Sequence, residues 1–169
     1  FYEGVVAEPQ FSHGRGFYDW PIEVEITCET PGATIYYTLD GSEPYSRTRQ
    51  IPSGSVYTGP ILLYQTTCLR AQAIKPEFLP SDPVTHTYLF LNDVATRSQS
   101  AVLGQGYPST WYGSYPAHYE MAPAVYNNPE YADVMDDALL AIPTLSIVTN
   151  KDHLFGKTND PETGGIYIY

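Results

Sequence analysis

Positively charged residues are scarce in this chain. Lysine and arginine together number 8 against 19 aspartates and glutamates, which gives a formal net charge of −11 at pH 7. Proteins that bind nucleic acids neutralise phosphates with clustered lysines and arginines, and anionic membrane surfaces attract the same kind of cluster. Because the few basic residues form no patch in the sequence, we expect binding to neither nucleic acid nor anionic membranes.

Long hydrophobic runs and catalytic motifs are also missing. A membrane-spanning helix needs a run of about 18 apolar residues, and none is present, so we expect no membrane insertion. The sequence contains no Gly-x-Gly-x-x-Gly, Walker A or His-Glu-x-x-His motif, and its four histidines are scattered. We therefore predict no catalytic, cofactor-binding or metal-binding residue. One alternative stays open, a Ca²⁺ loop with the oxygen ligands Asp152, Asn159, Asp160 and Glu162.

The adjacent acidic residues Asp136 and Asp137 resemble a catalytic carboxylate pair. Neighbouring residues on a helix point about 100° apart, because a turn contains about 3.6 residues. A glycosidase pair must converge on a sugar from both sides. We therefore interpret Asp136 and Asp137 as a solvated helix face.

Tyrosine and proline are abundant instead, with 16 and 15 residues. In residues 1–91, short β-forming segments alternate with turn sequences and no helical period is present, which predicts a mainly β fold, an Ig-like or fibronectin-like antiparallel sandwich. The alternation in residues 22–26 predicts that Ile22, Val24 and Ile26 face the core. The expected strands are Gly4–Ala7, Ile22–Cys28, Ala33–Leu39, Val56–Tyr57, Ile61–Tyr64, Cys68–Ile74 and Val84–Leu91.

An Asp-Gly pair follows the strand expected at Ala33–Leu39. A type I′ turn requires positive φ at both central residues, and Asp-Gly is a strong signal for it between two strands. We therefore predict a tight hairpin turn at Asp40 and Gly41.

The two cysteines, Cys28 and Cys68, fall on an early and a late expected strand. In a two-sheet sandwich these strands can face each other across the core, and an even cysteine count in an extracellular protein favours a disulfide. We predict a Cys28–Cys68 disulfide. The alternative is a pair of buried free thiols that pack as small hydrophobic groups.

The character of the sequence changes near Asn92. Residues 92–106 are small and polar, which predicts a linker or an arm wrapped on a neighbour. Residues 107–169 then form a partial α+β segment. It contains one expected helix at about Pro129–Ala141, begun by Asn128 and Pro129, a buried strand at Thr144–Thr149 and a helical turn at Asn150–Phe155.

An aromatic segment opens this second part. The tyrosine and tryptophan rings could stack on sugars, or they could pack against the sandwich or a partner subunit, since large rings are favoured at interfaces. The residues that we regard as possible glycan or partner contacts are Trp111, Tyr112, Tyr115 and Tyr119.

The first part resembles a known domain family. Several segments resemble, in sequence, order and spacing, those of the Ig-like module at the C-termini of chitobiases and β-hexosaminidases. The segments are Phe11–Ser12, Gly16–Tyr18, Val24–Cys28, Pro31–Pro44, Val56–Ile61, Thr67–Ala71 and Thr87–Phe90. The resemblance covers residues 9–90 and implies a non-catalytic sandwich.

Residues 107–169 resemble the start of a CotH-type spore-coat kinase domain. The similar segments are Tyr107–Trp111, Tyr119–Pro123, Leu139–Thr149, Leu154–Gly156 and Gly165–Tyr167. Ala122 departs from the family, which usually has an acidic residue there. The nucleotide-binding and catalytic segments of the family lie beyond Tyr169, so the resemblance assigns no catalytic residue to this chain.

These observations favour a non-catalytic extracellular or cell-surface module with a structural, adhesive or assembly role in a larger secreted bacterial protein. The partners that we expect are other subunits or domains of the same parent protein. A polysaccharide is a further possible partner. The chain starts at Phe1 and ends within an expected strand, Gly165–Tyr169, which suggests a processed product or a fragment. The alternatives are the N-terminal part of a CotH-like kinase and a carbohydrate-binding accessory module.

Overall fold

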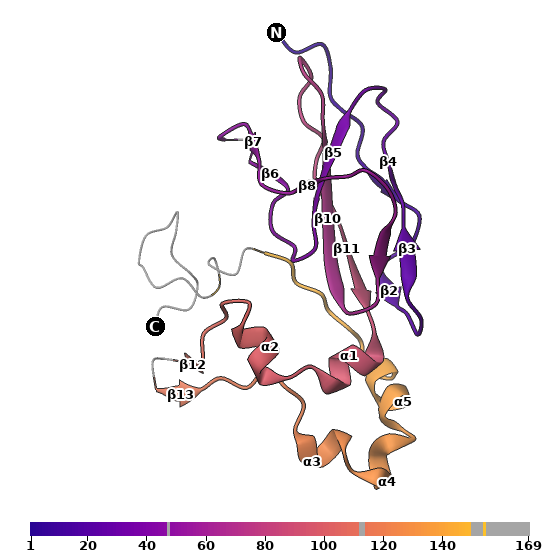
Figure 1. Ribbon diagram of the computed structural model, residues 1–169, viewed down its shortest axis with the longest axis vertical. Helices are drawn as coiled ribbons and strands as arrows, with labels where there is room; N and C mark the ends of the chain where they lie inside the picture. The colour runs from indigo at the N-terminus through magenta and orange to yellow at the C-terminus, as the bar shows by residue number, and fades with distance from the viewer. Residues whose placement is uncertain (47, 112–113, 150–153, 155–169) are drawn as a thin grey trace. The chain divides into compact units, whose positions relative to one another are not determined.

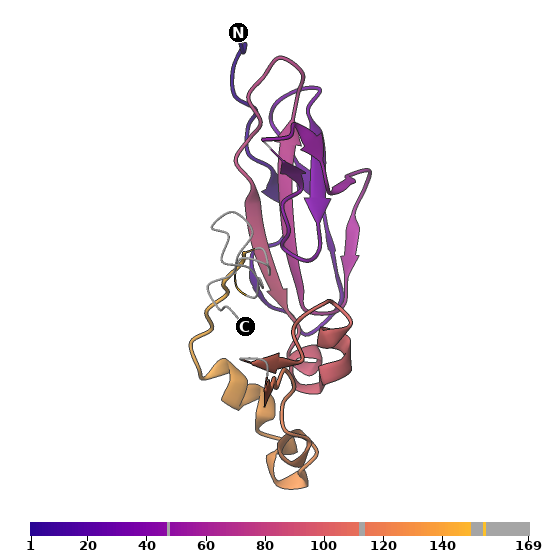
Figure 2. The same ribbon diagram turned by 90° about the vertical axis from the view of Figure 1, so that its left-hand side faces the viewer.

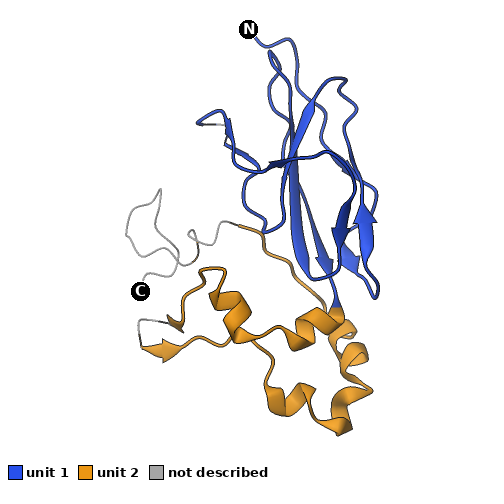
Figure 3. Ribbon diagram, viewed as in Figure 1, with its two compact units in different colours: residues 1–90 blue, residues 91–169 orange. Residues whose placement is uncertain are grey.

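The computed structural model describes residues 1–46, 48–111, 114–149 and 154, with only the backbone of Trp111. The chain divides into two compact units, Phe1–Phe90 and Leu91–Tyr169 (Figure 3).

Unit 1 consists of two layers of β-structure (Figures 1 and 2). One layer is a five-stranded sheet with the order β2-β11-β10-β5-β8, and the pairs β1–β4 and β3–β9 contribute the facing layer, while β6–β7 form a separate two-stranded arm. The strands are β1 (Gln10–Phe11), β2 (Gly16–Phe17), β3 (Ile22–Val24), β4 (Ile26–Thr27), β5 (Thr34–Thr38), β6 (Tyr45–Ser46), β7 (Ile51–Pro52), β8 (Ser55–Val56), β9 (Ile61–Leu63), β10 (Thr67–Ile74) and β11 (Val84–Leu89).

Strand β10 organises the larger sheet. It pairs antiparallel with β11, from Thr67 opposite Tyr88, and antiparallel with β5, as far as Ile74 opposite Thr34. The short strand β2 runs parallel to β11. The Ig-like sandwich that the sequence predicts is thus confirmed, with one parallel edge that a purely antiparallel arrangement does not include.

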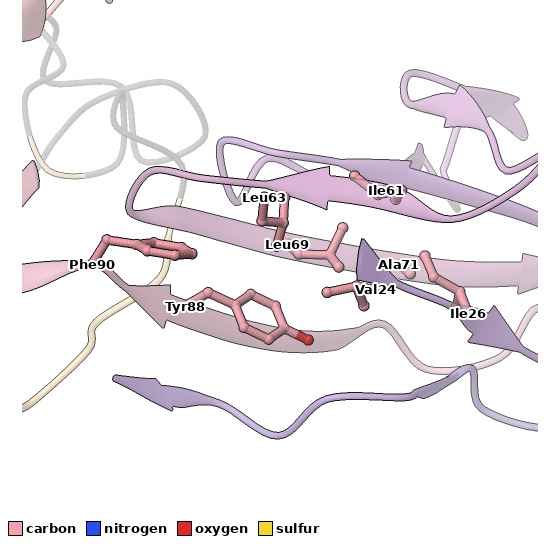
Figure 4. Packing of buried hydrophobic residues seen from close by; sticks show 8 residues of the cluster. All are labelled: Val24, Ile26, Ile61, Leu63, Leu69, Ala71, Tyr88 and Phe90. Atoms are coloured by element: carbon pink, nitrogen blue, oxygen red, sulfur yellow. The ribbon is translucent and has the colours of Figure 1, made fainter. Parts of the chain in front are cut away.

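The core lies between the two layers (Figure 4). As predicted, Val24 and Ile26 are buried, at 0% and 3% exposure, and Ile22 packs against the same cluster. They meet residues of the five-stranded sheet because alternate side chains of a strand share one face. The buried cluster consists of Val24, Ile26, Ile61, Leu63, Leu69, Ala71, Tyr88 and Phe90.

The predicted tight hairpin at Asp40 and Gly41 is wrong. The chain does turn there, and Gly41 has φ of 77°, but Asp40 is not among the described residues with positive φ, as a type I′ turn would require. The Asp40 carboxylate instead accepts hydrogen bonds from the backbone N–H and hydroxyl of Ser42, and the Gly41 N–H donates to the Cys68 carbonyl at 3.0 Å. The segment therefore stays beside β10, and β5 pairs with β10 and β8.

The predicted Cys28–Cys68 disulfide is also wrong, because both cysteines are free. Leu69 and Ala71 of β10 point into the core, so the strand alternation turns Cys68 to the opposite face of the sheet. Its Sγ lies 4.0 Å from the Thr87 hydroxyl on β11. The Cys28 thiol donates to the Ala7 carbonyl at 3.2 Å. The alternative of two free thiols is confirmed, although each cysteine is only partly buried.

Unit 2 contains short helices and one small hairpin. Its described elements are α1 (Leu91–Thr96), α2 (Gln99–Leu103), β12 (Thr110–Trp111), β13 (Tyr115–Pro116), α3 (Pro123–Tyr126), α4 (Pro129–Ala132) and α5 (Met135–Leu140). Helices α1 and α2 fall where we expected a linker or arm, so residues 92–106 have regular structure that this expectation did not include. No helix in the described part of the chain is long and apolar enough to span a membrane.

Two further expectations for this unit are wrong. The helix predicted at Pro129–Ala141 is divided into α4 and α5, although Asn128 does cap its start by accepting a hydrogen bond from the Glu130 N–H. The buried strand predicted at Thr144–Thr149 is irregular, and its Leu145 and Ile147 are exposed. Short helices and isolated strands need a packed apolar face for stability. The exposed side chains of Leu145 and Ile147 do not form such a face. Apart from Leu154, the expected turn at Asn150–Phe155 and the expected strand at Gly165–Tyr169 lie outside the described residues.

Candidate functional site

Of the aromatic residues singled out from the sequence, the structure describes the side chains of Tyr115 and Tyr119. Trp111 and Tyr115 are opposite each other in the β12–β13 hairpin, and Tyr115 is exposed. Tyr119 is used within unit 2, since its hydroxyl donates to the Pro108 carbonyl at 2.8 Å and its ring lies 5.8 Å from that of Tyr107. Tyr112 and the candidate Ca²⁺ ligands Asp152, Asn159, Asp160 and Glu162 lie outside the described residues.

Helix α2 is fixed to the segment that carries Tyr119. The Gln99 side chain accepts a hydrogen bond from the Tyr119 N–H at 2.8 Å and donates to the Ala117 carbonyl, while the Gln99 N–H donates to the Glu120 carboxylate at 2.7 Å. Tyr119 thus makes structural contacts within unit 2, and its assignment as a glycan or partner contact stays a prediction.

A groove with a volume of about 600 Å³ lies in unit 1 instead. Its lining residues belong to the N-terminal segment, the β6–β7 arm, β5, the end of β10 and the loop between β10 and β11, and Figure 1 shows the course of these elements. We call it the outer groove. Its lining residues are Tyr2, Val5, Thr34, Tyr36, Tyr45, Gln50, Ile74, Lys75, Pro76, Glu77, Phe78, Leu79, Pro80 and Asp82.

Strand alternation places the floor of the outer groove. Ile35 and Tyr37 of β5 pack against the core, so Tyr36 between them points to the other face of the sheet. The Tyr36 ring lies 6.4 Å from the ring of Tyr45 on β6, centroid to centroid. Two neighbouring aromatic rings therefore line one part of the groove.

The N-terminal segment is fastened to the opposite part. Its Val6 N–H donates to the Leu79 carbonyl at 2.9 Å, and the Leu79 N–H donates to the Gly4 carbonyl at 2.9 Å. These bonds hold Tyr2 and Val5 near the loop between β10 and β11. The lining of the groove thus includes residues from four separate parts of the chain, namely the N-terminal segment, β5, the β6–β7 arm and residues 74–82.

The loop between β10 and β11 starts with a tight turn whose third residue has an unusual backbone. The Phe78 N–H donates to the Lys75 carbonyl at 3.2 Å, and Glu77 has φ of 66°. With Pro76 second and a positive φ third, this has the features of a type II turn, in which glycine is favoured at the third position. The Lys75 ammonium lies 4.3 Å from the Phe78 ring centroid, which is a cation–π contact.

The groove presents aromatic rings and polar side-chain groups at its lining. Among the described residues, the hydroxyls of Tyr2, Tyr36 and Tyr45 and the side-chain amide of Gln50 have no hydrogen-bond partner. No group of three or more histidine, cysteine, aspartate or glutamate side chains within the described residues could hold a metal ion.

A second polar cluster fastens the segment before β2 to β11. The Tyr88 hydroxyl donates to the His13 carbonyl at 2.9 Å, and His86 Nδ1 lies 3.2 Å from the same oxygen. Burial lowers the pKa of His86 below its ordinary value, the bond to His13 acts in the opposite direction, and the charge of Arg15 lowers it further. Burial raises the pKa of Tyr88 far above its ordinary value. We interpret this cluster as structural.

The comparisons with known proteins bear on unit 1. Residues 14–85 match the family model described as the chitobiase/beta-hexosaminidase C-terminal domain. This family is a non-catalytic, Ig-like accessory module. The match confirms the first resemblance and includes every strand from β2 to β10, whereas it does not reach residues 107–169, so the resemblance to a CotH-type domain stays a prediction. No curated protein and no solved structure matches the chain.

Sequence reasoning missed the outer groove, although two local signals pointed to it. Consecutive Tyr36 and Tyr37 must face opposite sides of a strand, so one of the two rings had to leave the core. The stretch Lys75-Pro76-Glu77-Phe78 has proline at the second turn position without the glycine that usually follows. Neither signal indicates that Tyr2 and Tyr45 join the same groove.

Proposed function

We propose that this chain is a non-catalytic accessory module of a larger extracellular bacterial protein, in which the sandwich has a structural, adhesive or assembly role. The observation that carries the proposal is the match of residues 14–85 to a family of non-catalytic accessory domains. The occurrence of this family in secreted glycosidases supports an extracellular location.

The packing of unit 1 is consistent with such a role. Its core contains apolar side chains from both layers, with Leu69, Val24 and Tyr88 fully buried. A sandwich of this kind is a stable support to which other domains can be attached, and it needs no reacting groups. Other domains or subunits of the same parent protein are the partners that we propose.

Two measurements on the purified chain test this proposal. Chromogenic β-N-acetylglucosaminides should give no turnover above a blank, because the family is non-catalytic. Limited proteolysis followed by mass spectrometry should yield a resistant fragment that contains residues 10–89, since these carry the paired strands of unit 1. Turnover that survives repurification, or cleavage within β10 or β11 before cleavage elsewhere, would contradict the proposal.

A further inference from the structure

We infer that the outer groove binds a short, neutral oligosaccharide. The inference goes beyond the proposed accessory role, which holds for a module with or without a ligand. It rests on the aromatic lining, the unpaired polar groups, the charge and the backbone pairing of the groove.

The rings come first. Tyr2, Tyr36, Tyr45 and Phe78 all line the groove, and none of them belongs to the buried core cluster. A pyranose ring has apolar C–H faces that pack on flat aromatic rings, while its edge carries hydroxyls. A cavity of about 600 Å³ lies within the range of about 300–1,000 Å³ that is usual for ligand pockets.

The polar groups match the hydroxyl edge of a sugar. The tyrosine hydroxyls and the Gln50 amide can each donate and accept, and they have no partner among the described residues. Gln50 and Glu77 line the groove with φ of 54° and 66°, which is a left-handed backbone that glycine would adopt more easily. This backbone conformation favours glycine, which has no side chain, yet both positions carry a side chain that can form hydrogen bonds.

Charge and backbone pairing argue against other ligands. The described lining has two carboxylates, Glu77 and Asp82, and one ammonium, Lys75, so a phosphate or an acidic glycan would meet net repulsion. An added peptide strand would need a free sheet edge. At the groove, however, Tyr36 is paired with Gln72 of β10 on one side and with Val56 of β8 on the other.

The test is calorimetric titration of the full 169-residue chain with chitohexaose, cellohexaose and xylohexaose. We expect saturable binding of at least one of them. Tyr45→Ala should weaken it by about tenfold, the factor that corresponds to about 1.4 kcal/mol. Gln50→Gly should also weaken it, and this variant keeps a fold whose backbone already has the conformation that glycine favours. Tyr64→Ala is the matched control, because Tyr64 is exposed on unit 1 but does not line the groove.

Three results would overturn the inference. The first is the absence of saturable binding of all three oligosaccharides by the folded chain. The second is binding that Tyr45→Ala and Gln50→Gly both leave unchanged. The third is binding that Tyr115→Ala abolishes, since this would assign the sugar to unit 2. None of these results would affect the proposed non-catalytic role, which the turnover and proteolysis measurements test separately.

Discussion

Gln50 and Glu77, which lie far apart in the sequence, are the two described non-glycine residues with positive φ, and both line the outer groove. The left-handed backbone conformation costs a non-glycine residue about 1–2 kcal/mol. Backbone strain of this kind tends to cluster at functional sites. The coincidence of both residues in one groove is therefore the strongest structural sign of a binding site in unit 1.

The first prediction concerns this strain. Gln50→Gly and Glu77→Gly should each leave the free energy of unfolding unchanged or raise it by up to about 1 kcal/mol, because the relief of strain outweighs the added flexibility of the unfolded chain. Urea unfolding followed by circular dichroism measures this. Glu29→Gly, at an exposed residue without positive φ, should instead lower stability by about 0.5–1 kcal/mol. Losses at Gln50 and Glu77 equal to that of Glu29 would contradict the strain argument.

The second prediction compares two leucines of the sandwich. Leu69 is fully buried at the centre of the core, whereas Leu62 on β9 is 56% exposed. Leu69→Ala should lower the free energy of unfolding by about 2–5 kcal/mol, because it removes buried methyl groups and leaves a cavity. Leu62→Ala should change it by no more than about 0.5 kcal/mol. Equal effects of the two substitutions would mean that the β10 register is wrong.

The third prediction concerns the pH dependence of stability. The pKa of His86 is lowered in the folded protein, chiefly by burial, so the unfolded chain binds a proton more readily. Well above pH of about 6.5, His86 is neutral in both the folded and the unfolded state. As the pH falls below that value, the unfolded state binds a proton at His86 first, so the free energy of unfolding decreases. Urea unfolding between pH 8 and pH 5 should show this decrease. His86→Gln should reduce its size, and an identical slope in both proteins would refute the assignment.

The fourth prediction concerns the free cysteines. Titration of the unfolded, non-reduced chain with a thiol reagent should find both Cys28 and Cys68. In the folded chain Cys68 should react with iodoacetamide more slowly than an unperturbed thiol, because burial raises its pKa and the thiolate is the nucleophile. Peptide mapping identifies the modified cysteine. A Cys28–Cys68 linked peptide would contradict the structure of unit 1.

The sandwich could be predicted from the sequence because its strands carry strong local signals. The alternation at Val24 and Ile26 determines which side faces the core, and it does so without knowledge of the partner strands. The same rule, applied to Leu69 and Ala71, would have shown that Cys68 points away from the core. The disulfide prediction is wrong because it depends only on which strands face each other across the core. It takes no account of the face of β10 on which Cys68 lies.

The outer groove could not be predicted in the same way. The groove contains Tyr2, Tyr45 and Glu77, which are neighbours because β5 pairs with β10 and the N-terminal segment bonds to the loop after β10. Both pairings join residues that are far apart in the sequence. The Asp40-Gly41 prediction failed for a related reason. A turn preference is local, but the Gly41 N–H donates to the Cys68 carbonyl of β10, a strand that lies much later in the sequence.

The central claim is that unit 1 is an accessory sandwich whose outer groove holds an oligosaccharide. Its most direct test is an NMR titration of the isotope-labelled full chain with whichever hexaose shows binding by calorimetry, or with chitohexaose if none does. The account predicts that the amide signals of Tyr36, Tyr45, Gln50 and Glu77–Leu79 shift together and saturate. Shifts confined to residues 107–119, or no saturable shift at all, would contradict it.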